Sequence, residues 1–333
     1  MERVTLEDVA RRVGVSAKTV SNVVHGTGRV STDQRELIQK VIEELGYRPN
    51  IAARELRQGR SGVIALALPD LREPYFADLA SYFVAAAKER GRNVLITQTG
   101  GDRDSERSVM EAEDLPSVGT IVLSPLRLTA EDVARRKNTT SLVLLGEQAE
   151  EFHSATVAHV GVSNVRAAQS AVEHLIARGR RRIAAVGVQR EGPNASSTLR
   201  AEGYARALAS AGLPADEALR CEVDLFSRAA GSAAVQRLID AGTDFDALFC
   251  FNDSMAFGAL YTLAQNGIRV PDDVAVVGFD DVDEARYTIP ALTSVGPGPR
   301  KISGELFQII DGPDADRPIE HLLDYEVVVR ESS

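Results

Sequence analysis

Residues 5–26 read TLEDVARRVGVSAKTVSNVVHG, and they decide how the rest of the chain is interpreted. Thr5 can cap a helix with Asp8 as its capping-box partner, and the apolar residues that follow recur at helical spacing. Gly14 interrupts this pattern with a turn, and Ser16 can cap a second helix that runs to about Val24. Small and polar residues are left on the outer face of this second helix: Ala17, Lys18, Ser21 and Asn22. The pattern is typical of a helix-turn-helix, whose second helix enters the major groove of DNA, although a surface helical hairpin without a partner stays open.

The segment that follows favours the helix-turn-helix. Ser31 can cap a third helix, with Gln34 in the capping-box position, and Gly46 can end it. The next stretch, RPNIAARELRQG at residues 48–59, has a proline that suits a helix start, but it is too short to form a stable helix alone in water. We therefore expect a hinge that becomes helical only when something holds it.

Residues 4–60 resemble the DNA-binding headpiece and hinge of the LacI/GalR family of bacterial transcription regulators, through TLEDVARRVGVSAKTVSNVVHGTGRVS and ELGYRPNIAARELR. In that family one helix reads the major groove, and the paired hinge helices of a dimer place a leucine between base steps in the minor groove. The resemblance implies base contacts by Ala17, Lys18 and Asn22, and a wedge by Leu56. It also implies phosphate contacts by a polar set: Ser16, Thr19, Ser21, Asn50 and Arg54. Thr5 and Ala53 complete the predicted DNA-binding residues.

The chemistry of these side chains agrees with the implied roles. Lys18 can donate to O6 and N7 of guanine, Asn22 can pair with adenine, and Ala17 can contact a thymine methyl group. Leu56 is an apolar side chain of the kind that unstacks a base step and kinks DNA. It could also cover the hinge of a partner subunit, and the two roles are compatible.

The 333-residue chain has a net charge of −10 that is unevenly distributed. Residues 1–60 hold eleven Lys and Arg against eight Asp and Glu, which gives +3 there and −13 in the remainder. A mildly basic head on an acidic body suits a DNA-binding protein whose body does not adhere to DNA. Cys221 and Cys250 are too few for a disulfide framework, so we expect buried thiols in a reducing cytoplasm. We find no signal-peptide core and no run of about 18 apolar residues that could span a membrane, and we expect a cytoplasmic location.

From residue 63 onward, strand-like and helix-like segments alternate. VIALALP at 63–69 predicts a buried parallel strand, and the alternation restarts after residue 161, which predicts two α/β units with open parallel sheets. RRIAAVGV, STLRAEGYARAL, ALFCFNDSMAFGAL and RVPDDVAVVGFDD resemble the effector-binding core of the same family, which is similar to periplasmic sugar-binding proteins. The expected fold is an all-α helix-turn-helix headpiece followed by a two-lobed, periplasmic-binding-protein-like α/β core with Rossmann-like lobes.

The resemblance also implies where the domains divide. We expect a DNA-binding domain at 1–47 and a hinge at 48–60. The N-terminal lobe of the effector-binding domain is expected at 61–161 with 293–321. The C-terminal lobe is expected at 162–292 with 322–333.

Ligands of open α/β sheets bind beyond the carboxyl ends of the strands, and in a two-lobed protein both sets of ends face one cleft. The resemblance implies that the effector contacts are made by six residues: Tyr75, Phe76, Arg200, Phe226, Asn252 and Asp280. The aromatic rings could stack on a sugar or a base, and the polar side chains could fix hydroxyl or amide groups by hydrogen bonds.

Structural roles stay open for these residues. Tyr75 and Phe76 could be core residues at a helix start, and Arg200 could pair with Glu202 or with another acid at the surface. Asn252 could be a helix cap, and we expect Asp253 to be one. Asp280 could cap a turn.

Two other classes of protein fit the sequence less well. An enzyme is not expected, because the five His show no metal-ligand spacing and no P-loop or Gly-x-Ser-x-Gly motif is present; no cofactor is expected either. A solute-binding protein of the periplasmic type fits the body but not the headpiece. We therefore expect a cytoplasmic, homodimeric repressor that binds double-stranded operator DNA, has no membrane partner, and responds to a small-molecule effector. That effector is expected to be a sugar, with a nucleoside or purine as the alternative.

Overall fold

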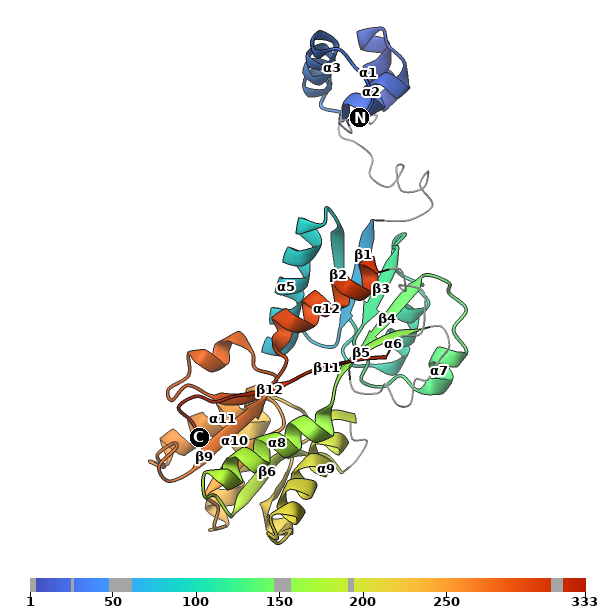
Figure 1. Cartoon of the computed structure of the whole chain (residues 1–333). Coiled ribbons are helices and arrows are strands. Elements are labelled where there is room, and N and C mark those ends of the chain that lie inside the picture. The colour runs from blue at the N-terminus through green and yellow to red at the C-terminus, as the bar shows by residue number, and fades with distance from the viewer. Residues whose placement is uncertain (1–3, 25–26, 48–61, 147–156, 191–194, 313–319) are drawn as a thin grey trace. The chain divides into compact units, whose positions relative to one another are not determined.

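Figure 1 shows the computed structural model of the chain, which describes residues 4–24, 27–47, 62–146, 157–190, 195–312 and 320–333. The chain divides into two compact units, residues 1–61 and residues 62–333. The predicted hinge at 48–60 lies outside the described residues, and so do four residues with predicted DNA contacts: Asn50, Ala53, Arg54 and Leu56. Within the described ranges, no helix has both the length and the apolar character needed to cross a bilayer.

The described residues of the first unit, 4–24 and 27–47, form the helices α1 (Leu6–Val13), α2 (Ala17–Val24) and α3 (Thr32–Leu45). Thr5 and Asp8 form the predicted capping box, and Gly14 ends α1 in the left-handed region at φ 78°. Apolar side chains from all three helices form one small core: Val9, Ala10, Val20, Val23, Ile38 and Val41. The capping box predicted for α3 is wrong, because the side chain of Ser31 makes no capping hydrogen bond. This helix is fixed by its apolar face instead.

The first lobe of the second unit, the N-lobe, contains a six-stranded sheet in the order β11-β5-β4-β3-β1-β2, and all its pairings are parallel. Its strands are β1 (Val63–Leu68), β2 (Asn93–Gln98), β3 (Thr120–Leu123), β4 (Ser141–Leu145), β5 (Ala158–Val162) and β11 (Glu320–Leu323). Its helices are α5 (Pro74–Glu89), α6 (Arg103–Met110), α7 (Ala130–Ala134) and α12 (Gly298–Asp311).

Strand β1 shows why helices cover both faces of this sheet. Ile64 and Leu66 pack with apolar residues of α5 and α12, whereas Ala65 and Ala67 pack with residues of α6 and α7. Successive side chains of a strand point to opposite faces, so a strand buried on both sides needs a continuous apolar run. The run at 63–69 predicted this burial correctly.

The second lobe, the C-lobe, has a six-stranded sheet in the order β12-β10-β9-β8-β6-β7. Its strands are β6 (Ile183–Val188), β7 (Arg220–Glu222), β8 (Ala247–Cys250), β9 (Ala275–Phe279), β10 (Thr293–Gly296) and β12 (Glu326–Val328). Its helices are α8 (Asn164–Ala177), α9 (Ala195–Ser210), α10 (Arg228–Asp240) and α11 (Asp253–Gln265), with short 3-10 turns η1 (Glu217–Leu219) and η2 (Asp283–Arg286). The sheet is parallel except that β12 runs antiparallel to β10.

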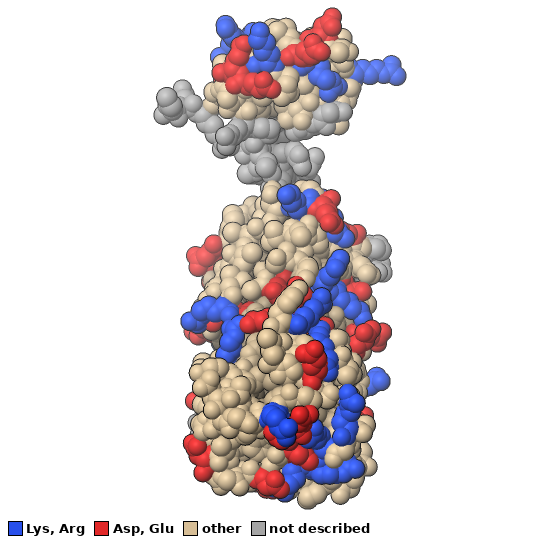
Figure 2. Space-filling view, turned by 90° about the vertical axis from the view of Figure 1, so that its left-hand side faces the viewer, with Lys and Arg blue, Asp and Glu red and all other residues tan. Residues whose placement is uncertain are grey.

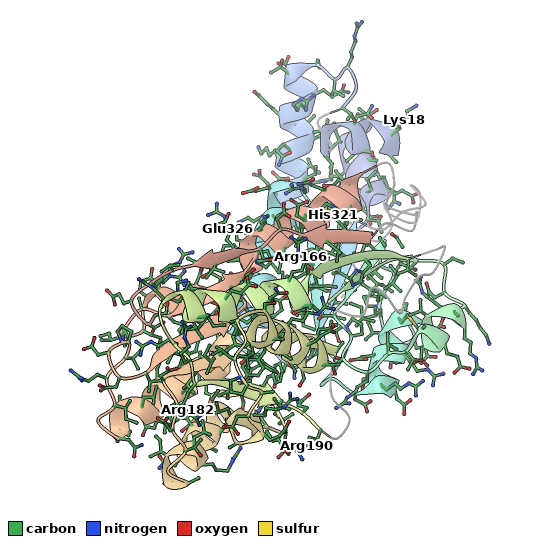
Figure 3. The ribbon with its side chains drawn as sticks, turned by 60° about the horizontal axis from the view of Figure 1, so that its bottom comes forward. Lys18, Arg166, Arg182, Arg190, His321 and Glu326 are labelled. Atoms are coloured by element: carbon green, nitrogen blue, oxygen red, sulfur yellow. The ribbon has the colours of Figure 1, made fainter. Side chains whose placement is uncertain are left out.

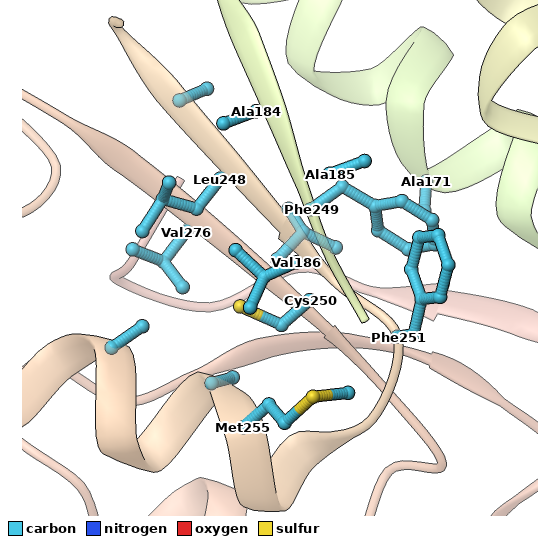
Figure 4. Close-up of a cluster of buried hydrophobic side chains, with 14 of the residues drawn as sticks. Ala171, Ala184, Ala185, Val186, Leu248, Phe249, Cys250, Phe251, Met255 and Val276 are labelled. Carbon is cyan, nitrogen blue, oxygen red and sulfur yellow. The ribbon is translucent and has the colours of Figure 1, made fainter. Parts of the chain in front are cut away.

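The core of the C-lobe surrounds β6 and β8, whose side chains lie between Ala171 of α8 and Met255 of α11 (Figure 4). Cys221 and Cys250 are buried free thiols, as predicted. They lie on the two strands that flank β6, and both are in register with Val186. Two strand spacings separate their Cα atoms by roughly 10 Å, beyond the roughly 7 Å that a disulfide can span.

Two of the predicted lobe boundaries differ from the sheets. The prediction begins the second N-lobe segment at residue 293, yet Thr293 pairs with Val277 of β9 and therefore belongs to the C-lobe sheet. The prediction ends that segment at residue 321, yet β11 continues in the N-lobe sheet to Leu323. The chain thus crosses between the lobes after β10 and after β11, because each strand completes its own sheet before the crossing. The other predicted boundaries stay predictions.

Candidate DNA-binding surface and ligand site

Helix α2 presents Lys18 to solvent, whereas Ala17 at its start packs against the headpiece core. Val20 and Val23 are buried, whereas Lys18 is exposed and Ala17 is partly exposed. Lys18 extends from α2 at the edge of the headpiece (Figure 3). The visible face of the headpiece carries Lys and Arg side chains beside Asp and Glu (Figure 2). The side chain of Lys18 is therefore accessible to a nucleic acid.

The polar residues at the helix starts have defined local bonds. The Ser16 Oγ accepts the backbone N–H of Thr19 at 3.1 Å and lies 2.8 Å from the Thr19 Oγ1, so it caps α2 as predicted. The Thr5 hydroxyl donates to the Asp8 carboxylate at 2.6 Å, and this hydrogen bond lowers the pKa of Asp8. Helix N-termini of this kind attract phosphate groups.

Ser21 and Asn22 are both partly exposed on α2. Asn22 is enclosed on one side by the loop that follows the helix. Gly28 there has φ 74°, and a Cβ atom on it would stand 2.6 Å from the Asn22 Nδ2. A glycine at this position leaves room for the amide of Asn22.

Arg200 on α9 is the centre of the candidate ligand site in the C-lobe. Only 4% of the residue is exposed. Its Nε donates to the Asn164 Oδ1 at 2.8 Å, its Nη1 donates to the Phe251 carbonyl oxygen, and its Nη2 lies 3.7 Å from the Asp280 Oδ1. The guanidinium also stands over the Phe279 ring, 3.6 Å from its centroid. The alternative pairing of Arg200 with Glu202 is wrong, because Glu202 pairs with Arg206 one helical turn further on.

Asp280 directly follows β9 and has an uncommon backbone, with φ 113°, and the next residue, Asp281, has φ 52°. Positive φ is costly for residues with a side chain and persists only where the surroundings enforce it. The Asp280 N–H donates to the Val295 carbonyl oxygen at 2.9 Å. This turn brings the Asp280 carboxylate to the side of the lobe that carries Arg200.

Asn252 caps α11 and Asp253 is its first residue, so the cap predicted for Asp253 is wrong and the cap left open for Asn252 is present. Asn252 is the cap, since its Oδ1 accepts the Met255 N–H at 2.9 Å. Asp253 is 1% exposed and accepts the Val282 N–H at 3.0 Å and the Ser294 hydroxyl at 2.6 Å. Burial raises the pKa of Asp253 to about 7. The expected cap is therefore a buried carboxyl group that joins α11 to the turn after β9.

The N-lobe contributes Tyr75 and Phe76, in the first turn of α5. Tyr75 packs against the cores of both lobes, and the two rings meet edge to face with centroids 5.0 Å apart. Glu73, which precedes α5, accepts a hydrogen bond at 2.7 Å from the Ser254 hydroxyl of α11. The start of α5 therefore lies against the start of α11, beside Asn252. Burial at this junction raises the pKa of Glu73.

Phe226 lies between β7 and α10 and packs against the C-lobe core. Its ring is 6.4 Å from that of Phe251, whose carbonyl oxygen holds Arg200. The described residues thus connect Arg200, Phe226, Asn252 and Asp280 through the end of β8, and the Glu73–Ser254 bond brings Tyr75 and Phe76 to the same junction.

Two surface hollows lie elsewhere. A groove of about 740 Å³ between β7 and α10 contains none of the six predicted ligand residues. A second, of about 470 Å³, includes Tyr82, Asp281 and Arg300 but again none of those six. The side-chain network around Arg200 defines the candidate site better than these hollows do. Within the described residues, no group of three or more His, Cys, Asp or Glu side chains could hold a metal ion.

Asn164 is the site residue that the sequence prediction missed. It is 2% exposed, it begins α8, and its Nδ2 donates to the Val162 carbonyl oxygen at 3.0 Å. It follows β5, a strand that the prediction does not include because His159 and Gly161 break the apolar run. Had β5 been recognised, the rule that ligand residues follow strands would have selected Asn164.

A helix-turn-helix headpiece joined to a two-lobed α/β unit with a polar site where the lobes meet defines a ligand-responsive DNA-binding regulator. A family profile described as "Bacterial regulatory proteins, lacI family" matches residues 5–50, and one described as "Periplasmic binding protein-like domain" matches residues 172–333.

Full-length relatives agree with these profiles. The transcriptional regulator CelR of Thermobifida fusca is 33% identical, covering 99% of this chain and 98% of its own. The transcriptional repressor CytR of Escherichia coli K12 is 28% identical, covering 99% and 96%. The solved structure of a CelR–cellobiose complex superposes with a TM-score of 0.68 at 31% identity, covering 99% and 100%. The chain belongs to the LacI family of bacterial transcriptional regulators.

Proposed function

We propose that this regulator is a cytoplasmic repressor that binds operator DNA as a homodimer and changes its operator affinity when a saccharide binds between its lobes. The observation that carries the proposal is the buried Arg200 network. A guanidinium held by Asn164 and the Phe251 carbonyl oxygen faces the carboxylate of Asp280 where the lobes meet. This unit is continuous in sequence with the headpiece.

A saccharide fits the chemistry of the site. Hydroxyl groups both donate and accept hydrogen bonds, so they match an arrangement of Asp280, Asn252 and Arg200. The ring of Tyr75 offers an apolar face from the other lobe, and sugars present such faces to aromatic side chains. The CelR regulator was solved in complex with cellobiose, and its sequence is 31% identical to this chain. This similarity supports a saccharide as the ligand class here. A nucleoside or purine is the other outcome of the test.

A homodimer is supported by apolar side chains left at the surface. In the N-lobe, Val84 of α5 and Ile96 of β2 are exposed on neighbouring elements, and in the C-lobe Tyr261, Tyr287 and Ile289 are 63%, 81% and 96% exposed. Exposed apolar side chains that form a contiguous patch mark protein interfaces, and we propose that these residues contribute to such patches. Two headpieces carried by a dimer would bind two half-sites of a near-palindromic operator.

In the headpiece, the proposed base contacts are those of Ala17, Lys18 and Asn22. The proposed phosphate contacts on the described residues are those of Ser16, Thr19 and Ser21, and Thr5 is a further proposed DNA-binding residue. On the hinge we propose phosphate contacts by Asn50 and Arg54, with Ala53 beside them, and a minor-groove wedge by Leu56.

Leu56→Ala should therefore weaken binding to the specific site far more than binding to unrelated duplex at the same salt concentration. Equal losses would reject the wedge.

The experiment that tests the proposal is selection of genomic fragments by the full-length protein, followed by titration with and without cellobiose, other saccharides and nucleosides. We expect one near-palindromic sequence to be enriched, and a saccharide to change its affinity. Asp280→Asn should remove that response and keep effector-free operator binding, whereas Lys18→Ala should weaken operator binding and keep the thermal shift caused by the saccharide. Failure to enrich any duplex would overturn the DNA-binding role, and a response to nucleosides alone would overturn the saccharide.

A further inference from the structure

Residues 330–333 are anchored in the C-lobe by hydrogen bonds that involve each residue. Ser332 is fully buried. Its N–H donates to the Ala291 carbonyl oxygen at 3.0 Å, its carbonyl oxygen accepts the Val276 N–H at 2.8 Å, and its hydroxyl donates to the Val276 carbonyl oxygen at 2.6 Å. The C-terminus is thus fixed between β9 and the segment that leads into β10.

Arg330 lies at the start of this anchored segment, and its side chain is 12% exposed. Its backbone N–H donates to the Thr293 Oγ1 at 2.8 Å, and its Nη1 donates to the Leu292 carbonyl oxygen at 2.7 Å. Its Nη2 donates to the Asp281 Oδ1 at 2.6 Å. The backbone N–H and the guanidinium of Arg330 therefore both make hydrogen bonds, and the guanidinium pairs with the carboxylate of Asp281.

Asp281 stands in the middle of the strained turn. Its N–H donates to the Ser294 Oγ at 3.0 Å, and the Ser294 hydroxyl donates to the buried Asp253 carboxylate, which also accepts the Val282 N–H. Two successive residues with positive φ cost about 1–3 kcal/mol each unless their surroundings fix them. The pairing of Asp281 with Arg330 supplies a charge-assisted hydrogen bond, which is about twice as strong as a neutral one.

We propose that Arg330 is a positioning residue of the ligand site: it holds Asp281, and thereby fixes the left-handed turn that brings Asp280 to Arg200. The C-terminal segment, which the site does not otherwise include, then sets the geometry of the ligand contact. This inference rests on the proposed function, because it takes Asp280 as a ligand residue. Without Arg330, the largely buried Asp281 carboxylate loses its cationic partner, and the turn relaxes toward negative φ.

The test compares Arg330→Gln with Arg178→Gln in the full-length protein. Arg178 also anchors the C-terminus, since its Nη2 donates to the Ser333 carbonyl oxygen at 3.1 Å, but it does not bond to Asp281. Amide hydrogen exchange of residues 278–284 should become about tenfold faster in Arg330→Gln and remain unchanged in Arg178→Gln. Equal exchange in the two variants, or no change in either, would overturn the proposal.

Two further variants separate positioning from loss of fold. Arg330→Lys keeps a charge near Asp281 and should restore part of the protection. The double variant with Asp281→Asn should exchange no faster than the worse single variant, because the two side chains act as one unit. If the two substitutions accelerate hydrogen exchange additively, Arg330 and Asp281 do not act as one unit.

The last arm uses cellobiose as the probe. The fold loss in cellobiose affinity of Arg330→Gln should be at least as large as its fold increase in the rate of hydrogen exchange. Operator binding without effector should stay at the wild-type level. Wild-type affinity for cellobiose in Arg330→Gln would overturn the inference. If the wild-type protein does not bind cellobiose, the choice of this saccharide fails, and the hydrogen-exchange comparison alone decides the role of Arg330.

Discussion

Asp253 is a carboxyl group buried behind the candidate ligand site. It accepts two hydrogen bonds, from Ser294 and Val282, yet burial outweighs them and raises its pKa from 3.8 to about 7. The neutral form is therefore favoured in the folded state below about pH 7. An acid with a raised pKa contributes stability that is fully present below its unfolded pKa and is lost as the pH rises through its folded pKa.

The direction of this change of stability with pH gives a prediction for Asp253→Asn. The wild-type free energy of unfolding should fall by about 1.4 kcal/mol per pH unit between pH 5 and pH 7 through this residue, and the variant should lack that component. Denaturant unfolding at pH 5, 6, 7 and 8 measures it, since the other titrating groups are shared and cancel in the difference. Parallel pH profiles for the two proteins would show that Asp253 does not titrate in this window.

Arg200 holds the site together through the shape and the several donors of its guanidinium, not through its charge alone. Its planar guanidinium reaches Asn164, Phe251 and the ring of Phe279 at once. A lysine is a single point charge and cannot reproduce this fork.

We therefore expect Arg200→Lys to be a severe substitution despite keeping the charge. It leaves buried acceptors unsatisfied, each at about 1–3 kcal/mol, so the C-lobe should lose roughly 2–4 kcal/mol. Chemical denaturation of the variant measures this loss, with Arg206→Lys as the control, because Arg206 is exposed and pairs with Glu202 on its own helix. Similar small losses in both variants would contradict the network.

At the scale of elements, α10 and α11 cross closely. A Cβ atom on Gly258 of α11 would lie 1.9 Å from the Arg228 carbonyl oxygen, and one on Gly231 of α10 would lie 2.3 Å from the Met255 carbonyl oxygen. Both obstacles are backbone atoms, so neither can move aside without shifting a helix. The first turn of α11, which carries Asn252 and Asp253, is positioned by this contact.

Gly258→Ala should separate the two helices and cost about 1–3 kcal/mol, the usual range for overpacking. Gly304, in the middle of α12, is the matched control, because nothing lies within 4 Å of its added Cβ. Gly304→Ala should instead stabilise the protein by up to about 1 kcal/mol through helix propensity. Thermal unfolding of the two variants measures the expected loss of stability in Gly258→Ala and the expected gain in Gly304→Ala. If Gly258→Ala is as stable as Gly304→Ala, the close crossing does not exist in solution.

Elements with strong periodic signals were predictable from the sequence. The capping box of Thr5 and Asp8 is local, and the run that forms β1 is fully apolar, so short-range physics specifies both. β5, β10 and β11 were not predicted as elements, because they are short, carry polar residues such as His159 and Thr293, and exist through pairing with strands distant in sequence. Asn164 was missed for the same reason, and the backbone of Asp280 could not be predicted, since distant partners enforce it.

At the scale of the second unit, helix α5 of the N-lobe contacts the C-lobe from its start as far as Tyr82. The Tyr82 hydroxyl donates to the Asp283 Oδ2 at 2.5 Å, and the Asp283 N–H donates to the Asp78 Oδ2 at 3.0 Å. Together with the Glu73–Ser254 bond, these contacts join α5 to the starts of η2 and α11. They form only when the lobes are close, so they favour the lobe arrangement described here over any arrangement that separates α5 from η2.

Tyr82→Phe removes a hydroxyl from this lobe contact without changing the packed ring. We expect the effector-free protein to sample more separated lobes, and its radius of gyration from small-angle X-ray scattering to rise. Tyr325→Phe is the matched control, because the Tyr325 hydroxyl lies 3.1 Å from the Ser170 Oγ of α8 and makes no bond to α5. Each variant should lose about 1 kcal/mol of stability, yet the scattering should change in Tyr82→Phe alone. An unchanged radius in both would mean that the Tyr82–Asp283 bond does not control the lobe arrangement, and that the packing of Tyr75 against both cores does.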